Sequence, residues 1–199
     1  MKLQGSLLIV ALGFTCMSLA GARVTEAQQS PVKAELPVLL TSCGQSPGPE
    51  RVVFFLKRLE LEHEFKEQAT VQDLKSGSFK TIIIVTGASL KGMGAAGVEI
   101  QDEIERTEAL IAEAKRAGIS IVGAHVEGMS RRAQGAAPGD NSDELSIDAV
   151  MPFSDLMIVR QDGDADRRFS IISENENIPL ILFEKNMELG NVLGGVFNQ

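Results

Sequence analysis

Three side chains with nucleophilic or basic chemistry stand where the chain leaves an apolar run. Cys43 comes soon after the run Leu36–Leu40, Ser89 lies in the segment after Thr81–Val85, and His125 directly ends a further apolar run. A serine hydroxyl or a thiol beside a histidine base is the arrangement with which hydrolases and transferases form covalent intermediates. One hypothesis is therefore that Ser89 or Cys43 attacks a substrate while His125 removes the proton.

Each of these residues also has a structural interpretation. The segment 87–91 contains the serine but carries lysine where the Gly-x-Ser-x-Gly nucleophile motif ends in glycine. Cysteine is frequently a buried and unreactive residue, and a single histidine at a strand end is commonly structural. The sequence leaves catalysis undecided.

Two glycine-rich segments, 41–49 and 86–97, follow the first and third apolar runs. Glycine permits close backbone approach, and loops that lead into helices can present N–H groups to an anion. The residues we predict to contact a ligand here are Ser42, Gln45, Ser46, Ser89, Lys91, Gly92 and Gly94. The alternative is that the glycines only allow a helix to pack tightly on its sheet.

Arg131 and Arg132 lie in the segment Val126–Asp140, which is rich in glycine, alanine and serine. A structureless stretch of about 15 residues is unusual inside a compact domain and is often functional. Because adjacent arginines suit a carboxylate or a phosphate, we predict that this pair approaches the glycine-rich segments. An exposed basic turn is the alternative.

Two other motifs are incomplete. Residues 92–97 read Gly-x-Gly-x-x-Gly, the fingerprint of a dinucleotide site, but they lie about six residues beyond the apolar run. The region 119–123, where the acidic residue of such a site is expected, contains no Asp or Glu. The segment 162–173 begins with alternating aspartates, yet Arg167 and Ser173 occupy the glycine and glutamate positions of a calcium loop. The sequence therefore predicts no cofactor and no metal.

The elements that position these residues alternate between strand and helix. Helical patterning is clearest in 100–117, where apolar residues recur every three or four positions. The strands are predicted at Leu36–Leu40, Leu61–Phe65, Thr81–Val85, Ile119–Ala124, Leu156–Val159 and Leu180–Phe183. Short apolar runs of this kind indicate a parallel sheet covered on both faces. We predict a single-domain, doubly wound α/β fold with a mainly parallel sheet of five to six strands.

The order of the strands follows from their polarity. Leu61–Phe65 is charged at alternate residues and suits a sheet edge, whereas Thr81–Val85 is almost wholly apolar and suits the centre. This favours the flavodoxin-like order 2-1-3-4-5, with the sixth strand extending it. Ligands of such sheets bind beyond the carboxyl ends of the strands where the order reverses, here between the first and third strands.

Composition limits the partners. The chain has 199 residues, 44% of them hydrophobic, with 19 Lys+Arg against 27 Asp+Glu and a formal charge of −8. It has no Trp and no Tyr. An acidic chain that is poor in aromatic residues is a poor candidate for nucleic-acid binding, so we expect a small polar or anionic molecule as partner and no nucleic acid.

The N-terminal residues predict a targeting signal. Lys2 precedes the apolar run Leu7–Ala20, and small residues follow, which is the pattern of a secretory signal peptide. We predict a signal peptide at 1–27, cleaved after Ala22 or Ala27, a polar tether at 28–35 and one domain at 36–199. The run is shorter than the roughly 20 residues of a membrane span. We therefore expect export to a bacterial periplasm or exterior, without stable membrane insertion after cleavage.

Three segments resemble one protein family. They are Val38–Pro47, Gly87–Gly97 and the pair Arg131-Arg132, and they are similar to an exported bacterial α/β family known only as a domain of unknown function. The resemblance implies export and an α/β fold and implies no activity. Cys43 departs from the family pattern, in which a small residue such as alanine is expected, so a thiol mechanism is not implied for the family.

These observations favour an exported domain that binds a small polar or anionic ligand at the switch point of its sheet. The alternatives are a hydrolase or transferase that uses Ser89 or Cys43 with His125, and a protein-interaction module. A large exposed apolar patch would favour the last of these.

Overall fold

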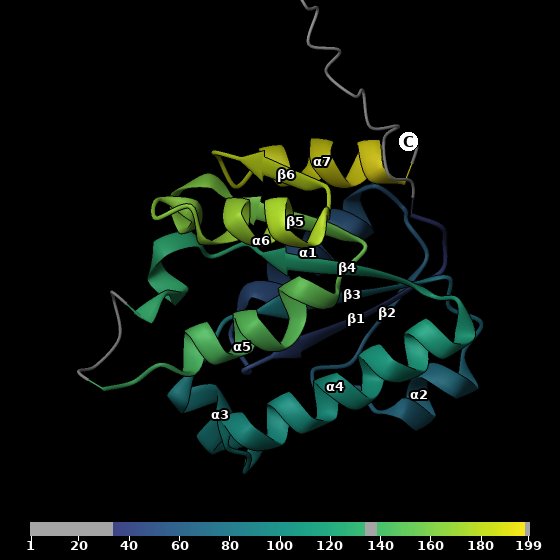
Figure 1. Cartoon of the computed structure of the whole chain (residues 1–199). Helices are drawn as coiled ribbons and strands as arrows, with labels where there is room; N and C mark the ends of the chain where they lie inside the picture. The colour runs from purple at the N-terminus through teal and green to yellow at the C-terminus, as the bar shows by residue number, and fades with distance from the viewer. Residues whose placement is uncertain (1–33, 134–138, 198–199) are drawn as a thin grey trace, which may run out of the picture.

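Six parallel strands make one sheet in the computed structural model, which describes residues 34–133 and 139–197 (Figure 1). The strands are β1 (Val38–Cys43), β2 (His63–Phe65), β3 (Thr81–Thr86), β4 (Ser120–His125), β5 (Leu156–Arg160) and β6 (Leu180–Phe183). Their order is β2-β1-β3-β4-β5-β6, and every neighbouring pair is parallel. The predicted α/β class and the flavodoxin-like order, with the sixth strand extending the sheet, are confirmed.

Burial explains the places of the first three strands. Every residue of β1 and β3 is buried, whereas Glu64 in β2 is exposed and its two neighbours are half-buried. A strand with charge on alternate residues can remain solvated only at an edge. β2 is shorter than predicted because Leu61 and Glu62 precede its ladder, and the Leu61 N–H donates to Leu56 O.

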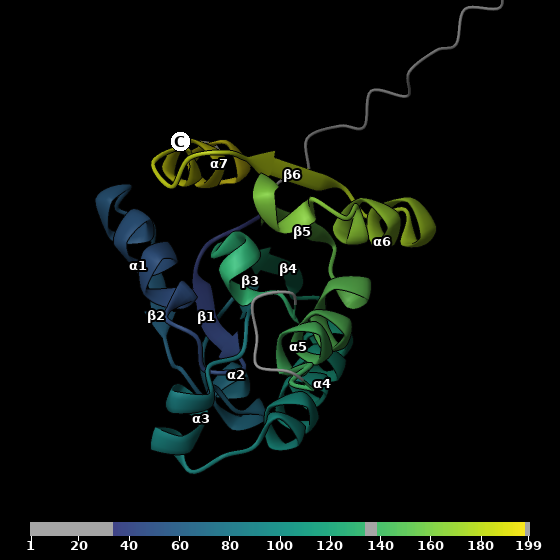
Figure 2. The same ribbon diagram turned by 90° about the vertical axis from the view of Figure 1, so that its left-hand side faces the viewer.

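Helices cover both faces of the sheet. They are α1 (Gly48–Arg58), α2 (Val71–Ser76), α3 (Leu90–Ala96), α4 (Ile100–Ala117), α5 (Ser142–Val150), α6 (Arg168–Glu176) and α7 (Glu188–Val196), with short 3₁₀ turns η1 (Gly128–Arg131), η3 (Met151–Phe153) and η4 (Gln161–Asp164). The hydrophobic clusters place α1 and α7 on one face and α2, α4, α5 and α6 on the other. Figure 2 shows α1 and α5 on opposite sides of β1 and β3.

The alternation of side chains along β3 divides the core. Ile83 and Val85 pack with residues of α1 and α7, whereas Ile82 and Ile84 pack with residues of α2, α4 and α5. Successive side chains of a strand point to opposite faces, so a strand with two covered faces needs an apolar residue at each position. This is why β3 reads as an unbroken apolar run.

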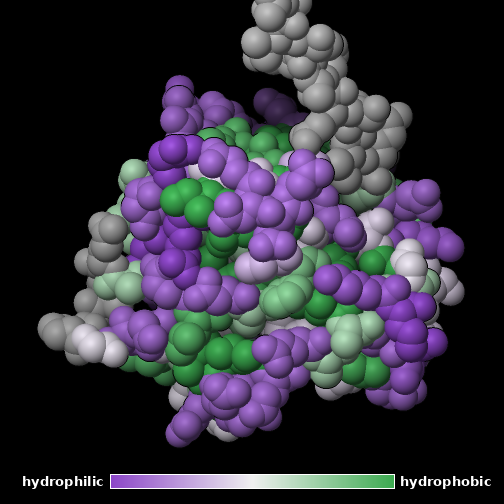
Figure 3. Space-filling view, in the orientation of Figure 1, coloured by the Kyte–Doolittle hydropathy of each residue, from purple (hydrophilic) through white to green (hydrophobic). Residues whose placement is uncertain are grey.

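The described chain begins against the domain. The Ala34 N–H donates to Val196 O at 3.1 Å, and the Glu35 N–H donates to Thr81 Oγ1 at 3.2 Å. The last two residues of the predicted tether therefore contact the domain, while the predicted signal peptide at 1–27 lies outside the described residues. None of the described helices combines the length and apolar character needed to cross a membrane. Hydrophilic side chains predominate on the face seen in Figure 3, with apolar residues interspersed among them.

Candidate functional site

The loops after β1 and β3 meet at the carboxyl edge of the sheet, as their place in the strand order predicts. Gln45 and Ala88 form an isolated antiparallel bridge, and the Ser89 N–H donates to Gly44 O at 2.7 Å. Gly44 has a φ of 103°, and a Cβ there would lie 2.6 Å from Gly87 O. Only glycine allows this contact, because an added side chain would strain the backbone and collide with the neighbouring loop.

The loop after β1 is held by a carboxylate of α4. Glu103 is 1% exposed, and its Oε2 accepts from the Gly44 N–H at 2.9 Å and from Gln45 Nε2 at 2.8 Å. Arg106 Nη2 lies 2.9 Å from the same oxygen and also donates to Ser42 O at 2.6 Å. Gln45 Nε2 also donates to Ser42 Oγ at 3.1 Å. The side chains of Ser42 and Gln45, predicted to face a ligand, are thus engaged in a buried network of the chain itself.

The loop after β3 is held in a similar way by α5. The Gly87 N–H donates to Ser146 Oγ at 3.0 Å, and the Ala88 N–H donates to Asp143 Oδ1 at 2.7 Å. Burial raises the pKa of the Asp143 carboxyl, against the effect of its hydrogen bond from Ala88. In both loops a side chain of the protein occupies backbone donors that a bound anion would otherwise use.

The start of α3 uses the residues predicted to cradle an anion. Ser89 is its N-cap, and Ser89 Oγ accepts from the Gly92 N–H at 3.1 Å. A Cβ on Gly92 would lie 2.2 Å from Gln45 O, whereas a Cβ on Gly94 would meet nothing within 4 Å. Lys91 is exposed. For Gly92 the close contact accounts for the glycine by packing, because the helix must pass very near the β1 loop.

The two arginines predicted to act as a pair point to different partners. Arg131 reaches the switch point, where its Nη1 donates to Ala88 O at 2.8 Å. Arg132 is 3% exposed and binds Glu144 Oε1 at 2.8 Å and Asp166 Oδ2 at 2.7 Å. Arg132 therefore ties the η1 segment to α5 and to the turn before α6, and of the two arginines only Arg131 bonds to the loop after β3.

A polar cluster remains at the switch point. Glu127 is 3% exposed, and its Oε2 lies 3.5 Å from Arg131 Nε. Both atoms are buried, and within the described ranges neither has a hydrogen-bond partner. A Cβ on Gly48 would lie 3.1 Å from Glu127 Oε2 and 3.2 Å from Ser46 Oγ. We call Ser46, Gly48, Glu127 and Arg131 the switch-point cluster; it joins the loops after β1 and β4.

His125 is a satisfied, neutral histidine. It is fully buried, its Nε2 lies 3.1 Å from Gly128 O, and its Nδ1 lies 3.1 Å from Thr86 Oγ1. Since a carbonyl only accepts, Nε2 carries the proton and Nδ1 accepts from the hydroxyl of Thr86. Burial lowers the pKa of His125 to about 4. Within residues 34–133 and 139–197, it makes no hydrogen bond to Ser89 or Cys43.

The thiol of Cys43 is unreactive in this fold. It is fully buried at the end of β1, and burial raises the pKa of its thiol to about 12. The thiolate is the nucleophilic form of cysteine. A thiol with this pKa is protonated at neutral pH and is a poor nucleophile.

Asp164, one of the alternating aspartates of the incomplete calcium-loop motif, caps a helix. Asp164 Oδ1 accepts from the Phe169 N–H at 2.7 Å and from the Ser170 N–H at 3.2 Å, at the start of α6. Among the side chains that the structure describes, no three His, Cys, Asp or Glu residues are grouped so as to hold a metal ion.

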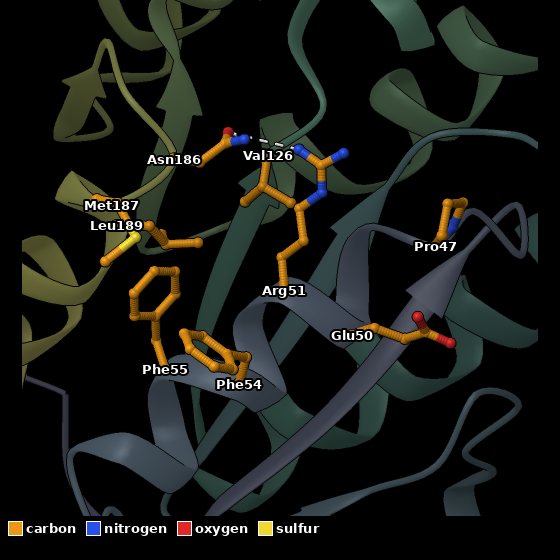
Figure 4. A pocket seen from close by; sticks show the side chains of 9 residues that line it. All are labelled: Pro47, Glu50, Arg51, Phe54, Phe55, Val126, Asn186, Met187 and Leu189. Atoms are coloured by element: carbon orange, nitrogen blue, oxygen red, sulfur yellow. Dashed lines mark hydrogen bonds between the residues drawn. The ribbon is translucent and has the colours of Figure 1, made fainter.

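A cavity of about 450 Å³ opens between α1 and the turn that joins β6 to α7. Figure 4 shows the side chains that line it. They are Pro47, Glu50, Arg51, Phe54, Phe55, Val126, Asn186, Met187 and Leu189. Pro47 and Val126 directly precede Gly48 and Glu127 in the chain, so the cavity adjoins the switch-point cluster.

The chain matches the model of one protein family over most of its length. The model of a domain of unknown function, DUF6305, matches residues 35–197. The chain belongs to the DUF6305 family. This confirms the predicted resemblance to a family of unknown function, and it assigns no activity to the DUF6305 domain.

No curated protein matches the chain. Among solved structures, the DUF6305 domain is similar to the psychrotrophic esterase EstA from Pseudoalteromonas sp., with 10% identity over 83% of this chain and 96% of that one and a TM-score of 0.37. It is similar to TesA with 11% identity over 81% of this chain and 97% of that one, at a TM-score of 0.36. Likenesses this distant say nothing about the chemistry of the DUF6305 domain.

Sequence reasoning missed the carboxylates that hold the loops. Glu103 stands three residues after Ile100 and four before Thr107, so it falls on the apolar stripe of its helix. An acidic residue on the apolar stripe of a helix indicates a buried carboxylate, and this pattern could have singled out Glu103. Asp143 gave a weaker one, because its helix is short and mixed in polarity.

Proposed function

We propose that the DUF6305 domain binds a small polar ligand at the carboxyl edge of its sheet, at the switch-point cluster. One observation carries this proposal: Glu127 Oε2 and Arg131 Nε are buried without hydrogen-bond partners in the described part of the chain. Buried polar atoms are almost always hydrogen-bonded, and leaving one unsatisfied costs about 1–3 kcal/mol. A ligand that satisfied both atoms would recover part of this cost.

The two atoms specify the chemistry of the ligand. A carboxylate only accepts hydrogen bonds, and a guanidinium only donates them. The ligand therefore presents a donor beside an acceptor, as a hydroxyl, an amide or an amino acid does. Arg131 is partly offset by Glu127 at 3.5 Å, and Glu103 and Asp143 already fill the nearby backbone donors. This distribution of charge favours a neutral or zwitterionic ligand over a simple anion.

Binding is better supported than hydrolysis. A base needs a free ring nitrogen within reach of a nucleophile, whereas both nitrogens of His125 are bonded elsewhere. Cys43 is buried with a raised pKa, and Ser89 Oγ caps α3. No specific contact in the described residues favours the protein-interaction alternative.

Native mass spectrometry of the full chain, purified without denaturation, tests the proposal. We expect a small molecule to be retained by the wild type and by Glu174→Gln, a control in an exposed ion pair. We expect Glu127→Gln and Arg131→Met to lose it while keeping a native circular dichroism spectrum. Ordered water at the cluster in a high-resolution crystal structure, with no retained mass, would contradict the proposal.

A further inference from the structure

We infer that the cavity between α1 and the β6–α7 turn is a second site, which binds a linear aliphatic carboxylate. It holds the acyl chain against Phe54, Phe55 and Met187 and the carboxylate against Arg51. This site shares no residue with the switch-point cluster, and the observations that carry it are independent of the proposed function.

The size and shape of the cavity suit a chain-like molecule. Its volume of about 450 Å³ lies within the range of about 300–1,000 Å³ that is usual for small-molecule sites. A second hollow of about 160 Å³ shares Phe55 and Met187 with it and continues between α1 and α7 to Leu59 and Gly190. The two hollows together follow the line between the helices, which fits an extended chain better than a compact ring.

The walls of the cavity are mostly apolar and partly open to solvent. Phe54 is 55% exposed and Met187 is 61% exposed, whereas Phe55 and Leu189 behind them are buried. Figure 4 shows the two phenyl rings below the side chains of Met187 and Leu189. An aliphatic chain laid between them would remove apolar surface from water on both sides, which is the source of affinity for such a ligand.

The larger cavity is lined by one cation, Arg51, whereas Arg58 lines the smaller hollow. Arg51 is half-buried, and its Nη1 lies 3.4 Å from Asn186 Oδ1, a neutral partner. Over the two described ranges, no carboxylate lies within salt-bridge distance of it. Figure 4 shows the guanidinium of Arg51 directed to Asn186, while the carboxylate of Glu50 extends away from the phenyl rings. A guanidinium fork matches a carboxylate in two hydrogen bonds.

In the larger cavity a single arginine, Arg51, lies beside apolar side chains, and this pairing selects a ligand with a negative group at that end and an aliphatic tail. A compact dianion would bring its second charge near Glu50, and a cation would meet Arg51. We therefore use hexanoate, octanoate and decanoate as probes, each below its micellar concentration, with decyltrimethylammonium as the control of opposite charge.

Isothermal titration calorimetry of the full chain gives the first readout. Each added methylene that enters the groove should tighten binding about fourfold, and decyltrimethylammonium should bind more weakly than decanoate. Arg51→Gln should weaken decanoate binding about tenfold, and Phe54→Ser should flatten the dependence on chain length. The exposed residue Lys57, on the same helix, provides the matched control, and Lys57→Gln should bind decanoate like the wild type.

Three outcomes would overturn the inference. The first is the absence of saturable decanoate binding by the wild type, and the second is equal binding by Arg51→Gln and Lys57→Gln. The third is a stable dimer in analytical ultracentrifugation that Phe54→Ser dissociates and decanoate does not affect, because the groove would then be covered by a second copy. Unchanged thermal melting of the variants shows that a loss of binding is not a loss of fold.

Discussion

Replacing Arg106 with methionine tests whether the buried pair of α4 holds the switch-point loop. The substitution leaves the Glu103 carboxylate, which is 1% exposed, without its counter-charge. It also removes the donors that reach Ser42 O and Ala69 O. Breaking a buried ion pair by removing one partner costs about 3–5 kcal/mol. Because the Arg106 side chain is itself 14% exposed, we expect the lower end of that range, about 3 kcal/mol.

Urea denaturation and thermal melting of the full chain measure the effect. For a domain of this size, 1 kcal/mol corresponds to about 2–4 °C in Tm, so we expect Arg106→Met to lower Tm by about 6–12 °C. Arg116→Met is the matched control, because Arg116 pairs with Glu113 at the same spacing on α4 but is 69% exposed. Its Tm should scarcely change, since exposed pairs contribute little.

A double variant separates charge from packing. Adding Glu103→Gln to Arg106→Met removes the uncompensated carboxylate, and it should restore part of the lost stability. A melting temperature for Arg106→Met equal to that of Arg116→Met would show that the buried pair does not stabilise the domain. A double variant less stable than Arg106→Met alone would show that the lost stability does not come from an uncompensated buried charge.

Three further results are expected. Burial lowers the pKa of His125 from its ordinary 6.5 to about 4, so the unfolded state takes up the proton at higher pH than the folded state. As the pH drops from 6.5 towards 4, the free energy of unfolding of the wild type should therefore fall more than that of His125→Asn. Equal pH dependence of the two proteins in urea denaturation would contradict this. Burial raises the pKa of Cys43 to about 12. Peptide mapping after treatment with iodoacetamide at pH 8 should therefore find Cys43 unmodified in the native protein and alkylated in urea. Alkylation of Cys43 in the native protein would contradict this prediction. Gly94→Ala should stabilise α3 by about 0.5–1 kcal/mol. Gly92→Ala should destabilise the protein, because the added Cβ would lie 2.2 Å from Gln45 O. Equal Tm values for the two variants would disprove the packing role of Gly92.

The order of the strands could be predicted because it depends on which residues meet water. The charges at Glu62 and Glu64 place the predicted strand 61–65 at an edge, and the unbroken apolar run 81–85 needs cover on both faces. Once that order is known, the meeting of the loops after the first and third strands follows from the parallel direction of the sheet.

The contents of the site could not be predicted, because they depend on contacts far apart in the chain. Gly44 and Glu103 are 59 positions apart, and the sequence gives no measure of which helix residue reaches which loop. Arg131 and Arg132 show the same limit at short range. Their charges are alike and adjacent, yet one reaches Ala88 and the other Glu144, because each arginine bonds to whichever acceptor the surrounding fold brings near it.

Both ends of the described chain lie at the amino edge of the sheet. Ala34 contacts Val196 at the end of α7, and Glu35 contacts Thr81, the first residue of β3. The switch-point cluster lies at the opposite edge, beyond the carboxyl ends of the strands. A solid support, a fluorescent label or an affinity tag joined at Ala34 or Val196 would therefore lie at the amino edge of the sheet, opposite the switch-point cluster. Immobilisation at Ala34 or Val196 would leave the carboxyl edge of the sheet directed towards the solution.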